Sequence, residues 1–436
     1  MTIESEAVTA AAAHGRHARQ SVTRAIAGRL SWGLADQAAS SASNFVVGAY
    51  VARSLGLAAF GMFSLVWVTY GVLLSVSRGL ATDPLVVRFS AVPVASWRVA
   101  VARSTGTAIG VGTAVGGVSV ALGLIVGGQM GIAFACLGVV LPGLLLQDAW
   151  RFSFFAAGTG RKAFMNDIVW DIALIPALVV AAHVGGVGVF VLAWGGSAGV
   201  AALYGWFQSG VRPQLSGARQ WIREQRDLGY RYLVENVGLS GARQLRAYGL
   251  GLIVGVSAVG VVRSAELMLG PFLAVLMGMS LATVAEAARV LQRAPERLGR
   301  FCFLVGGGQA AGALLWGGAV LLVPDRAGEL VLGAAWHAAS LIIIPATLGV
   351  AGSSLGVGAT VGLRALGAAR SSLRCQLITS ALYVAGGLGG AVVAGTPGSA
   401  WGVAAATLTG SALWWLQLRS VLRKHQQNPI REARTP

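Results

Sequence analysis

The sequence predicts an all-α membrane protein with about twelve transmembrane helices in two pseudo-symmetric six-helix lobes. Three observations lead to this fold class: an apolar composition, twelve apolar segments of spanning length, and an internal repeat. Of the 436 residues, 55% are hydrophobic and only 11% are charged, and the mean hydropathy is +0.70. A soluble domain carries about 25% charged residues. The composition therefore excludes a soluble protein and indicates a multi-pass membrane protein.

The apolar segments define the predicted helices, because a span needs about 20 mostly apolar residues. Six fall in a first lobe, 30–208, and six in a second lobe, 231–420. A basic linker, 209–230, separates the lobes, and polar tails, 1–29 and 421–436, flank them. The predicted spans are 30–52, 58–78, 99–125, 131–157, 164–184, 186–208, 232–254, 259–283, 301–323, 338–361, 374–394 and 399–420. No short apolar core with a cleavage site precedes the first span, so we expect no cleaved signal peptide.

The positive charge is distributed unevenly between the two sides of these spans. The chain carries 33 Lys and Arg against 16 Asp and Glu, a net charge of +17. With the N-terminus in the cytoplasm, the opposite loops hold only Arg53 and Arg326. Because cytoplasmic loops of membrane proteins are enriched in Lys and Arg, we expect a cytoplasmic-membrane protein with both termini in the cytoplasm. Topology then explains the charge without a nucleic-acid partner.

The two halves of the chain repeat each other at an offset of 199 to 211 residues. An even number of spans in each half makes both halves enter the membrane in the same sense. Parallel repeats of this kind occur in transporters, whose substrate path lies between the halves. Equivalent pairs include Asp36 and Glu235, Gly56 and Gly255, Gly61 and Gly260, Gly71 and Gly270, and Gly158 and Gly367.

The first span of each half has a polar face, unlike a helix that faces lipid on all sides. In the first half this face carries Asp36, Gln37 and Asn44, and in the second half it carries Glu235, Asn236, Gln244, Arg243 and Arg246. Such residues either hold helices together through hydrogen bonds or line a wet cavity.

Three arginines, Arg243, Arg246 and Arg263, fall inside predicted spans. A charge at the centre of the bilayer costs about 2.5–3.5 kcal/mol, so these residues must face a wet cavity or have partners. Arg263 has Glu266 at i+3, whereas Arg243 and Arg246 have no carboxylate at i±3 or i±4. We therefore expect unpaired guanidinium groups, which favour an anionic ligand such as phosphate.

The acidic residues allow several interpretations. Asp36 is a candidate proton site, a helix-packing acid, or a partner for a cavity arginine, and Glu235 is its equivalent. Asp148 and Arg151 are spaced i, i+3 and are expected to form a structural pair. Asp167 and Asp171 are expected to form a surface charge cluster. The cysteines are interpreted as core residues and the histidines lack metal-ligand spacing, so we expect no metal and no cofactor.

Short motifs spread over nearly the whole chain resemble one group of transporters. They are Trp32-Gly33-Leu34 through Asn44-Phe45, Val51-Ala52-Arg53-Ser54-Leu55-Gly56, Phe60-Gly61-Met62-Phe63, Leu332-Gly333-Ala334-Ala335-Trp336, Leu363-Arg364-Ala365-Leu366-Gly367-Ala368-Ala369-Arg370, and Pro397-Gly398-Ser399-Ala400-Trp401-Gly402-Val403-Ala404. These motifs are similar to those of O-antigen-type polysaccharide flippases in the multidrug/oligosaccharidyl-lipid/polysaccharide (MOP) transporter superfamily.

The resemblance implies a two-lobed bundle that moves a polyprenyl-pyrophosphate-linked glycan to the outer leaflet. Relatives that flip the peptidoglycan precursor use cavity arginines for the pyrophosphate. Arg53 and Arg263 look similar to such groups, and Arg243 and Arg246 are added to them. Relatives that export cationic drugs use an acid in the first span, which Asp36 resembles. Two features depart from these branches: twelve spans instead of fourteen, and an arginine-rich second lobe.

The combined prediction is an alternating-access flippase for a lipid-linked oligosaccharide, not an enzyme. Its partners would be the lipid-linked glycan, membrane lipids, and a polysaccharide polymerase and glycosyltransferases. The predicted pyrophosphate site is Arg243, Arg246, Arg263 and Arg53. The predicted glycan contacts are Gln37, Asn44, Asn236 and Gln244, and the candidates for proton or ion coupling are Asp36 and Glu235.

Three alternatives remain open at this point. The first is an ion-coupled small-molecule exporter of the MATE type, with Asp36 as the proton site. The second is a membrane-bound glycan polymerase or ligase, although the longest outer loop, 324–337, offers only Asp325, Glu329 and His337. The third is a scaffold without transport.

Overall fold

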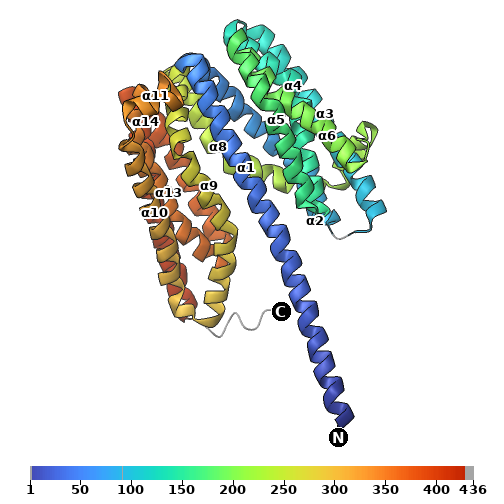
Figure 1. The fold of residues 1–436 in the computed structure, drawn as a ribbon. Helices are drawn as coiled ribbons and strands as arrows, with labels where there is room; N and C mark the ends of the chain where they lie inside the picture. Colours follow the sequence, from blue (N-terminus) through green and yellow to red (C-terminus); the bar gives the residue numbers. More distant parts are fainter. Residues whose placement is uncertain (1, 91, 428–436) are drawn as a thin grey trace.

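The computed structural model describes the chain over residues 2–90 and 92–427. Its side chains are described except at 2–39, 235, 237–240, 275, 277–282, 284–285, 369 and 425–427. Within these ranges every regular element is helical (Figure 1). The long helices are α1 (Thr2–Ser77), α3 (Val94–Val126), α4 (Gly128–Ala156), α5 (Gly160–Val184), α6 (Val187–Ser209), α8 (Arg226–Ile253), α9 (Val256–Arg293), α10 (Leu298–Leu321), α13 (Ile343–Ala365) and α14 (Ala369–Gln427). The short ones are η1 (Arg78–Thr82), α2 (Asp83–Phe89), η2 (Leu215–Gly217), α7 (Ala218–Glu224), η3 (Pro295–Arg297), α11 (Asp325–Leu332) and α12 (Ala335–Ser340).

The number of membrane-crossing segments agrees with the predicted fold class. In the part of the chain that is described, nine stretches are long and apolar enough to cross a membrane. Two of them, in α1 and in α14, contain a non-helical break, at Gly56 and at Ala394–Gly395. The chain turns back at both breaks (Figure 1), so each stretch supplies two segments. The more polar α8 adds the twelfth. The prediction of an all-α membrane protein is confirmed.

Glycines at equivalent positions of the two halves make the same turns. Gly56 has a φ of 71° and Gly255 a φ of 107°, and each lies between the first and second spans of its half. Gly158 and Gly367, another repeated pair, have φ angles of 68° and 66°. Side chains other than that of glycine are disfavoured at such positive φ values. The repeat in the sequence therefore corresponds to a repeated backbone conformation.

The helices form two bundles that separate toward the N-terminal end of α1 (Figure 1). In one bundle α4 packs on α3 and α6, and in the other α13 packs on α10 and α14. Glycines allow these helices to approach closely: a Cβ added at Gly116 would overlap the backbone of Gly138, and one at Gly402 would overlap Gly386. Close approach through small residues is the usual way in which helices associate in lipid. The pairing of α1 with α9 joins the bundles.

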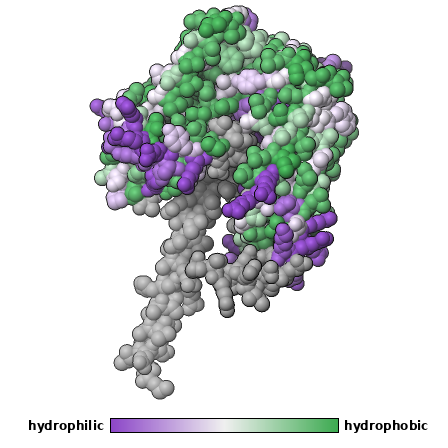
Figure 2. Space-filling model, turned by 180° about the vertical axis from the view of Figure 1, so that it is seen from behind, coloured by the Kyte–Doolittle hydropathy of each residue, from purple (hydrophilic) through white to green (hydrophobic). Residues whose placement is uncertain are grey.

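The two ends of the molecule differ in their polarity. The end that carries α2 and α7 is called the basic end here, and α11 and α12 lie at the opposite end. Figure 2 shows hydrophilic side chains gathered at the lower ends of both bundles and apolar side chains above them. The predicted linker is attached to the basic end, because Arg88 donates hydrogen bonds to Gln225 Oε1 (2.7 Å) and to Asp227 Oδ2 (2.5 Å).

A network of buried charges ties the helices of the first bundle together. Arg78 makes a bidentate contact with Asp148, at 2.6 and 2.9 Å. Arg151 lies between Asp148 (3.9 Å) and Asp167 (3.1 Å). The expected pair of Asp148 with Arg151 is present, but Arg78 is the closer partner. The expectation that Asp167 is a surface residue is wrong: it is 4% exposed, because Gln147 and Arg151 reach it from α4.

Candidate functional site

A polar cavity of about 910 Å³ lies between the second bundle and the first two spans of the chain. Its walls come from α1, α8, α9, α13 and α14. Along α13 the lining extends from Ala346 to Arg364, over 18 residues of a helix that rises about 1.5 Å per residue. The cavity therefore follows most of the thickness of a membrane.

Four arginines and a single glutamate are the charged side chains that line this cavity within the described residues: Arg243, Arg246, Arg263, Arg364 and Glu266. Glu266 lies between two of the arginines. Its carboxylate is 3.4 Å from Arg246 Nη2 and 3.5 Å from Arg263 Nη1. Arg246 therefore has a partner on the neighbouring helix, which contradicts the expectation that it is unpaired. Intrahelical spacing did not reveal this contact, because Glu266 belongs to α9 and Arg246 to α8.

Arg243 and Arg364 differ from the two paired arginines. Both are exposed to the cavity, and neither makes a hydrogen bond or an ion pair with any described side chain. Among the described side chains, the cavity therefore carries excess positive charge, and two of its guanidinium groups have no partner there. A planar guanidinium donates hydrogen bonds in a fork that matches phosphate oxygens.

Aromatic rings hold the paired guanidinium groups in place. Arg246 Cζ lies 5.3 Å from the centre of the Tyr383 ring, and Arg263 Cζ lies 5.9 Å from that of Trp67. Trp67 stacks on Trp194, with ring centres 4.8 Å apart. Each contact is within the range of cation–π attraction. The rings also place flat apolar surfaces beside the charges.

Hydroxyl and amide groups cover the wall of the cavity that α13 and α14 form. On α14 they lie at i, i+3, i+4 and i+7: Gln376, Thr379, Ser380 and Tyr383. Ser353 and Thr360 on α13, with Thr407 and Ser411 on the second part of α14, complete the wall. The Ser411 hydroxyl is buried without a hydrogen-bond partner among the described residues. Such a wall suits a ligand rich in hydroxyl groups.

Several of the predicted site residues come together in this cavity. Arg243, Arg246, Arg263, Asn44 and Gln244 line it. The side-chain oxygen of Gln244 is buried and has no hydrogen-bond partner in the described part of the chain.

Two predicted residues lie elsewhere. Arg53, near the turn at Gly56, donates a hydrogen bond to the carbonyl oxygen of Leu330 in α11 (2.9 Å). Asn236 donates to Asp83 Oδ2 (2.8 Å) at the basic end. Neither side chain lines the cavity, so we leave both out of the proposed site. Asp36, Gln37 and Glu235 lie outside the side chains that the structure describes.

Arg364, Tyr383, Trp67 and the hydroxyl groups of α13 and α14 were not predicted as site residues. The signal for the α14 residues was present, because their spacing of 3, 4 and 7 makes a polar stripe on an otherwise apolar helix. Arg364 follows an apolar span, where the enrichment of Lys and Arg in cytoplasmic loops already accounts for a basic residue.

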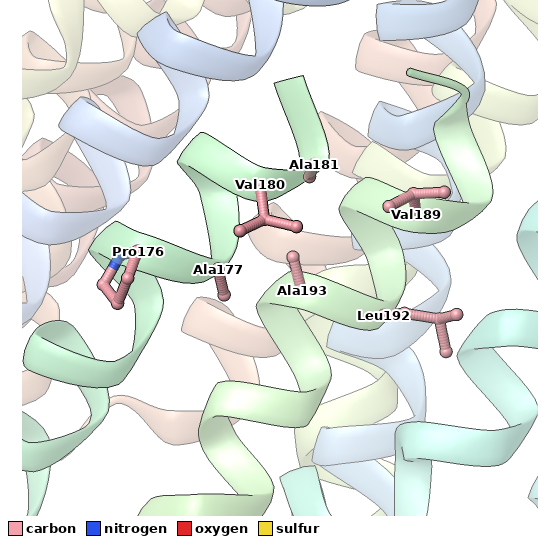
Figure 3. A pocket seen from close by; sticks show the side chains of 7 residues that line it. All are labelled: Pro176, Ala177, Val180, Ala181, Val189, Leu192 and Ala193. Carbon is pink, nitrogen blue, oxygen red and sulfur yellow. The ribbon is translucent and has the colours of Figure 1, made fainter. Parts of the chain in front are cut away.

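A second pocket, shown in Figure 3, has a different chemistry. It lies between α5 and α6, and its volume is about 410 Å³. Only apolar side chains line it, Pro176, Val180 and Leu192 among them. It offers no hydrogen bond to a polar ligand and is not a candidate glycan site.

Two helices that line the polar cavity, α1 and α9, cross closely near the turns at Gly56 and Gly255. A Cβ added at Gly61 would overlap the carbonyl oxygen of Val256, and one at Gly260 would overlap that of Leu57. Gly61 and Gly260 are equivalent residues of the repeat and lie against each other. The two halves therefore contact each other through equivalent glycines of the repeat.

Comparison with known proteins identifies the fold. No protein-family model and no curated protein sequence matches the chain. An inward-facing multidrug-resistance MATE transporter of the MOP superfamily matches with a TM-score of 0.71 and 14% identity, over 92% of this chain and 96% of that one. The lipid II flippase MurJ, in an inward closed conformation, matches with a TM-score of 0.65 and 9% identity, over 89% and 88%.

A third solved structure is a MOP superfamily transporter from Pyrococcus furiosus, described as having a binding pocket of reverse polarity. It matches with a TM-score of 0.54 and 16% identity, over 92% of this chain and 96% of that chain. At such low identities the likeness concerns the fold alone. The chain is a multi-pass helical membrane protein with the fold of MOP superfamily transporters.

Proposed function

We propose that this protein is an alternating-access flippase for a polyprenyl-pyrophosphate-linked oligosaccharide. The observation that carries the proposal is the charge of the cavity, whose described lining has four arginines and a single glutamate. Unpaired arginines in a membrane cavity are costly and mark a substrate path. A pyrophosphate compensates this charge, and a cationic drug does not.

The remaining walls fit the other parts of such a substrate. Asn44, Gln244 and the hydroxyl groups of α13 and α14 would contact sugar hydroxyls, and Trp67 and Tyr383 would contact the apolar faces of sugar rings. The polyprenyl tail would stay in the lipid beside the gap between the bundles. Rocking of the lobes about the crossing of α1 and α9 would expose the cavity to one leaflet and then to the other.

The test of this function is glycan export by cells that depend on the protein. Arg243→Ala and Arg263→Ala each remove a charge-assisted contact worth about 1.5–3 kcal/mol, so we expect export to fall at least about tenfold. Arg289→Ala is the matched control, because Arg289 lies on α9 outside the cavity and pairs with Glu286 on the surface (2.7 Å). Wild-type export by both cavity variants, at equal protein levels, would contradict the arginine role.

A second candidate is an ion-coupled exporter of small molecules. Two observations favour it: the fold likeness to MATE transporters and a hydrogen bond of 2.5 Å from Ser43 to Asp171, between α1 and α5. A carboxylate in this setting is suited to binding a proton or a cation.

Drug susceptibility separates the two functions. If the protein exports cationic drugs by proton exchange, Asp36→Asn or Asp171→Asn will make cells more sensitive to them. The flippase proposal predicts unchanged drug sensitivity in both variants.

A further inference from the structure

Glu266 occupies the position in the cavity where a ligand anion would bind. Its two carboxylate oxygens face Arg246 and Arg263 separately, at 3.4 and 3.5 Å. The Glu266 side chain is 43% exposed, whereas that of Arg246 is only 8% exposed. The carboxylate is therefore free to move away from a guanidinium that stays in place.

The arginines would keep their positions if Glu266 moved. Arg246 is held over Tyr383 and Arg263 over Trp67, and the stem of Arg246 packs against Gly387. Both guanidinium groups therefore have an aromatic contact that does not depend on the carboxylate. An incoming anion would find both groups already oriented.

A singly charged ligand gains little from displacing Glu266. Its single charge takes the place of the Glu266 carboxylate, also a single charge, at Arg246 and Arg263. The displaced carboxylate remains nearby on α9 and repels the ligand. A diphosphate brings a second charged group, which can contact Arg243, an arginine without a partner in the described structure. The cost of displacing Glu266 is the same for both ligands, so it sets an affinity threshold that only the ligand with the second contact passes.

We propose that Glu266 is a selectivity residue that keeps singly charged phosphodiesters out of the cavity while admitting diphosphates. The need for such a residue follows from the surroundings, because phosphodiester headgroups of membrane lipids are far more abundant than any lipid-linked glycan. An arginine cavity without an internal anion would fill with these lipids. The inference rests on the proposed function and adds a reason for the one acid among the described side chains that line the cavity.

The test compares two ligands that differ by one phosphoryl group: farnesyl methyl diphosphate and farnesyl methyl phosphate. Their Kd values for the full-length protein in detergent are measured by isothermal titration calorimetry. We expect the wild type to prefer the diphosphate. In Glu266→Gln both ligands should bind about tenfold more tightly, as expected for loss of one close charge interaction, so that the phosphodiester binds at concentrations at which the wild type leaves it unbound.

The controls separate this inference from the proposed function. Glu286→Gln removes the same charge from α9 outside the cavity and should leave both Kd values unchanged, whereas Glu266→Asp should stay close to the wild type. Unchanged Kd values in Glu266→Gln, with binding still abolished by Arg243→Ala, overturn the selectivity role and leave the flippase function intact. Phosphodiester binding gained by Glu266→Gln supports the selectivity role even if the arginine variants export glycan normally. Absence of binding of either ligand to both wild type and Glu266→Gln overturns both.

Discussion

At the scale of single residues, the two bundles handle charges inside the membrane in different ways. The first bundle surrounds its arginines with carboxylates, so that Arg78 and Arg151 contact Asp148 and Asp167. The second bundle leaves Arg243 and Arg364 exposed to the cavity. The first arrangement stabilises the packing of helices, and the second provides a binding surface. The distinction predicts different consequences when a charge is removed.

Asp148→Ala should destabilise the protein strongly. The substitution leaves Arg78 and Arg151 without their shared partner, and breaking a buried ion pair costs about 3–5 kcal/mol. We expect the Tm of the purified protein in detergent to fall by at least about 5 °C. Glu296→Ala serves as control, because the Glu296–Arg297 pair is exposed (67% and 79%) and 3.9 Å apart. An unchanged Tm for Asp148→Ala would show that the network does not stabilise the fold.

At the scale of elements, the crossing of α1 and α9 is the tightest contact between the halves. Gly61 and Gly260 lie against each other with no space for a Cβ. Helices in lipid associate through van der Waals packing, so this contact depends on the absence of side chains. A methyl group introduced at either position would push α1 and α9 apart.

Gly61→Ala and Gly260→Ala should therefore open the cavity toward the opposite end. The measurement is labelling, from that side, of a cysteine placed at Asn44 in a protein without its three native cysteines. We expect faster labelling and slower transport in both variants. Gly110→Ala is the matched control, because a Cβ at Gly110 in α3 meets nothing within 4 Å. Equal labelling rates in all variants would exclude the crossing as the closure of the cavity.

The elements themselves were largely predictable from the sequence, and the partners of polar residues were not. Apolar segments of about 20 residues define a span directly, and the repeated glycines at 56 and 255 mark equivalent turns. The pairing of Glu266 with Arg246 was not predicted, because periodicity describes one helix at a time. For the same reason Asp167 was assigned to the surface, although α4 covers it. Helix α11 and the start of α12 lie in the predicted outer loop, 324–337, because helices shorter than a span leave no apolar segment of spanning length in the sequence.

At the scale of the whole molecule, the two halves touch near both ends of the cavity. Beyond the crossing of α1 and α9, Arg53 reaches Leu330 at the opposite end. At the basic end Asn236 of α8 contacts Asp83 of α2, and Leu233 lies close to Gly79. Alternating access requires one of these sets of contacts to break at each step.

A cross-link at the basic end should stop the transport cycle. Cysteines at Asp83 and Asn236, whose side chains are 2.8 Å apart, are expected to form a disulfide in a protein without its native cysteines. We expect oxidation to abolish glycan export and a reductant to restore it, with either single cysteine as control. Full export by the oxidised double variant would show that α2 and α8 need not separate.

The permanence of the arginine charge has a consequence for energetics. A guanidinium group stays protonated at every physiological pH, so an empty cavity cannot lose its positive charge by titration. A transmembrane voltage acts on such a charge with about 2.3 kcal/mol per elementary charge per 100 mV. A potential that is negative at the basic end therefore favours the conformation in which the empty cavity opens toward that end. The voltage thus assists the return step that follows each release of substrate. Dissipating the voltage with valinomycin and potassium, at constant pH gradient, should slow export, and an unchanged rate would show that the return step senses no field.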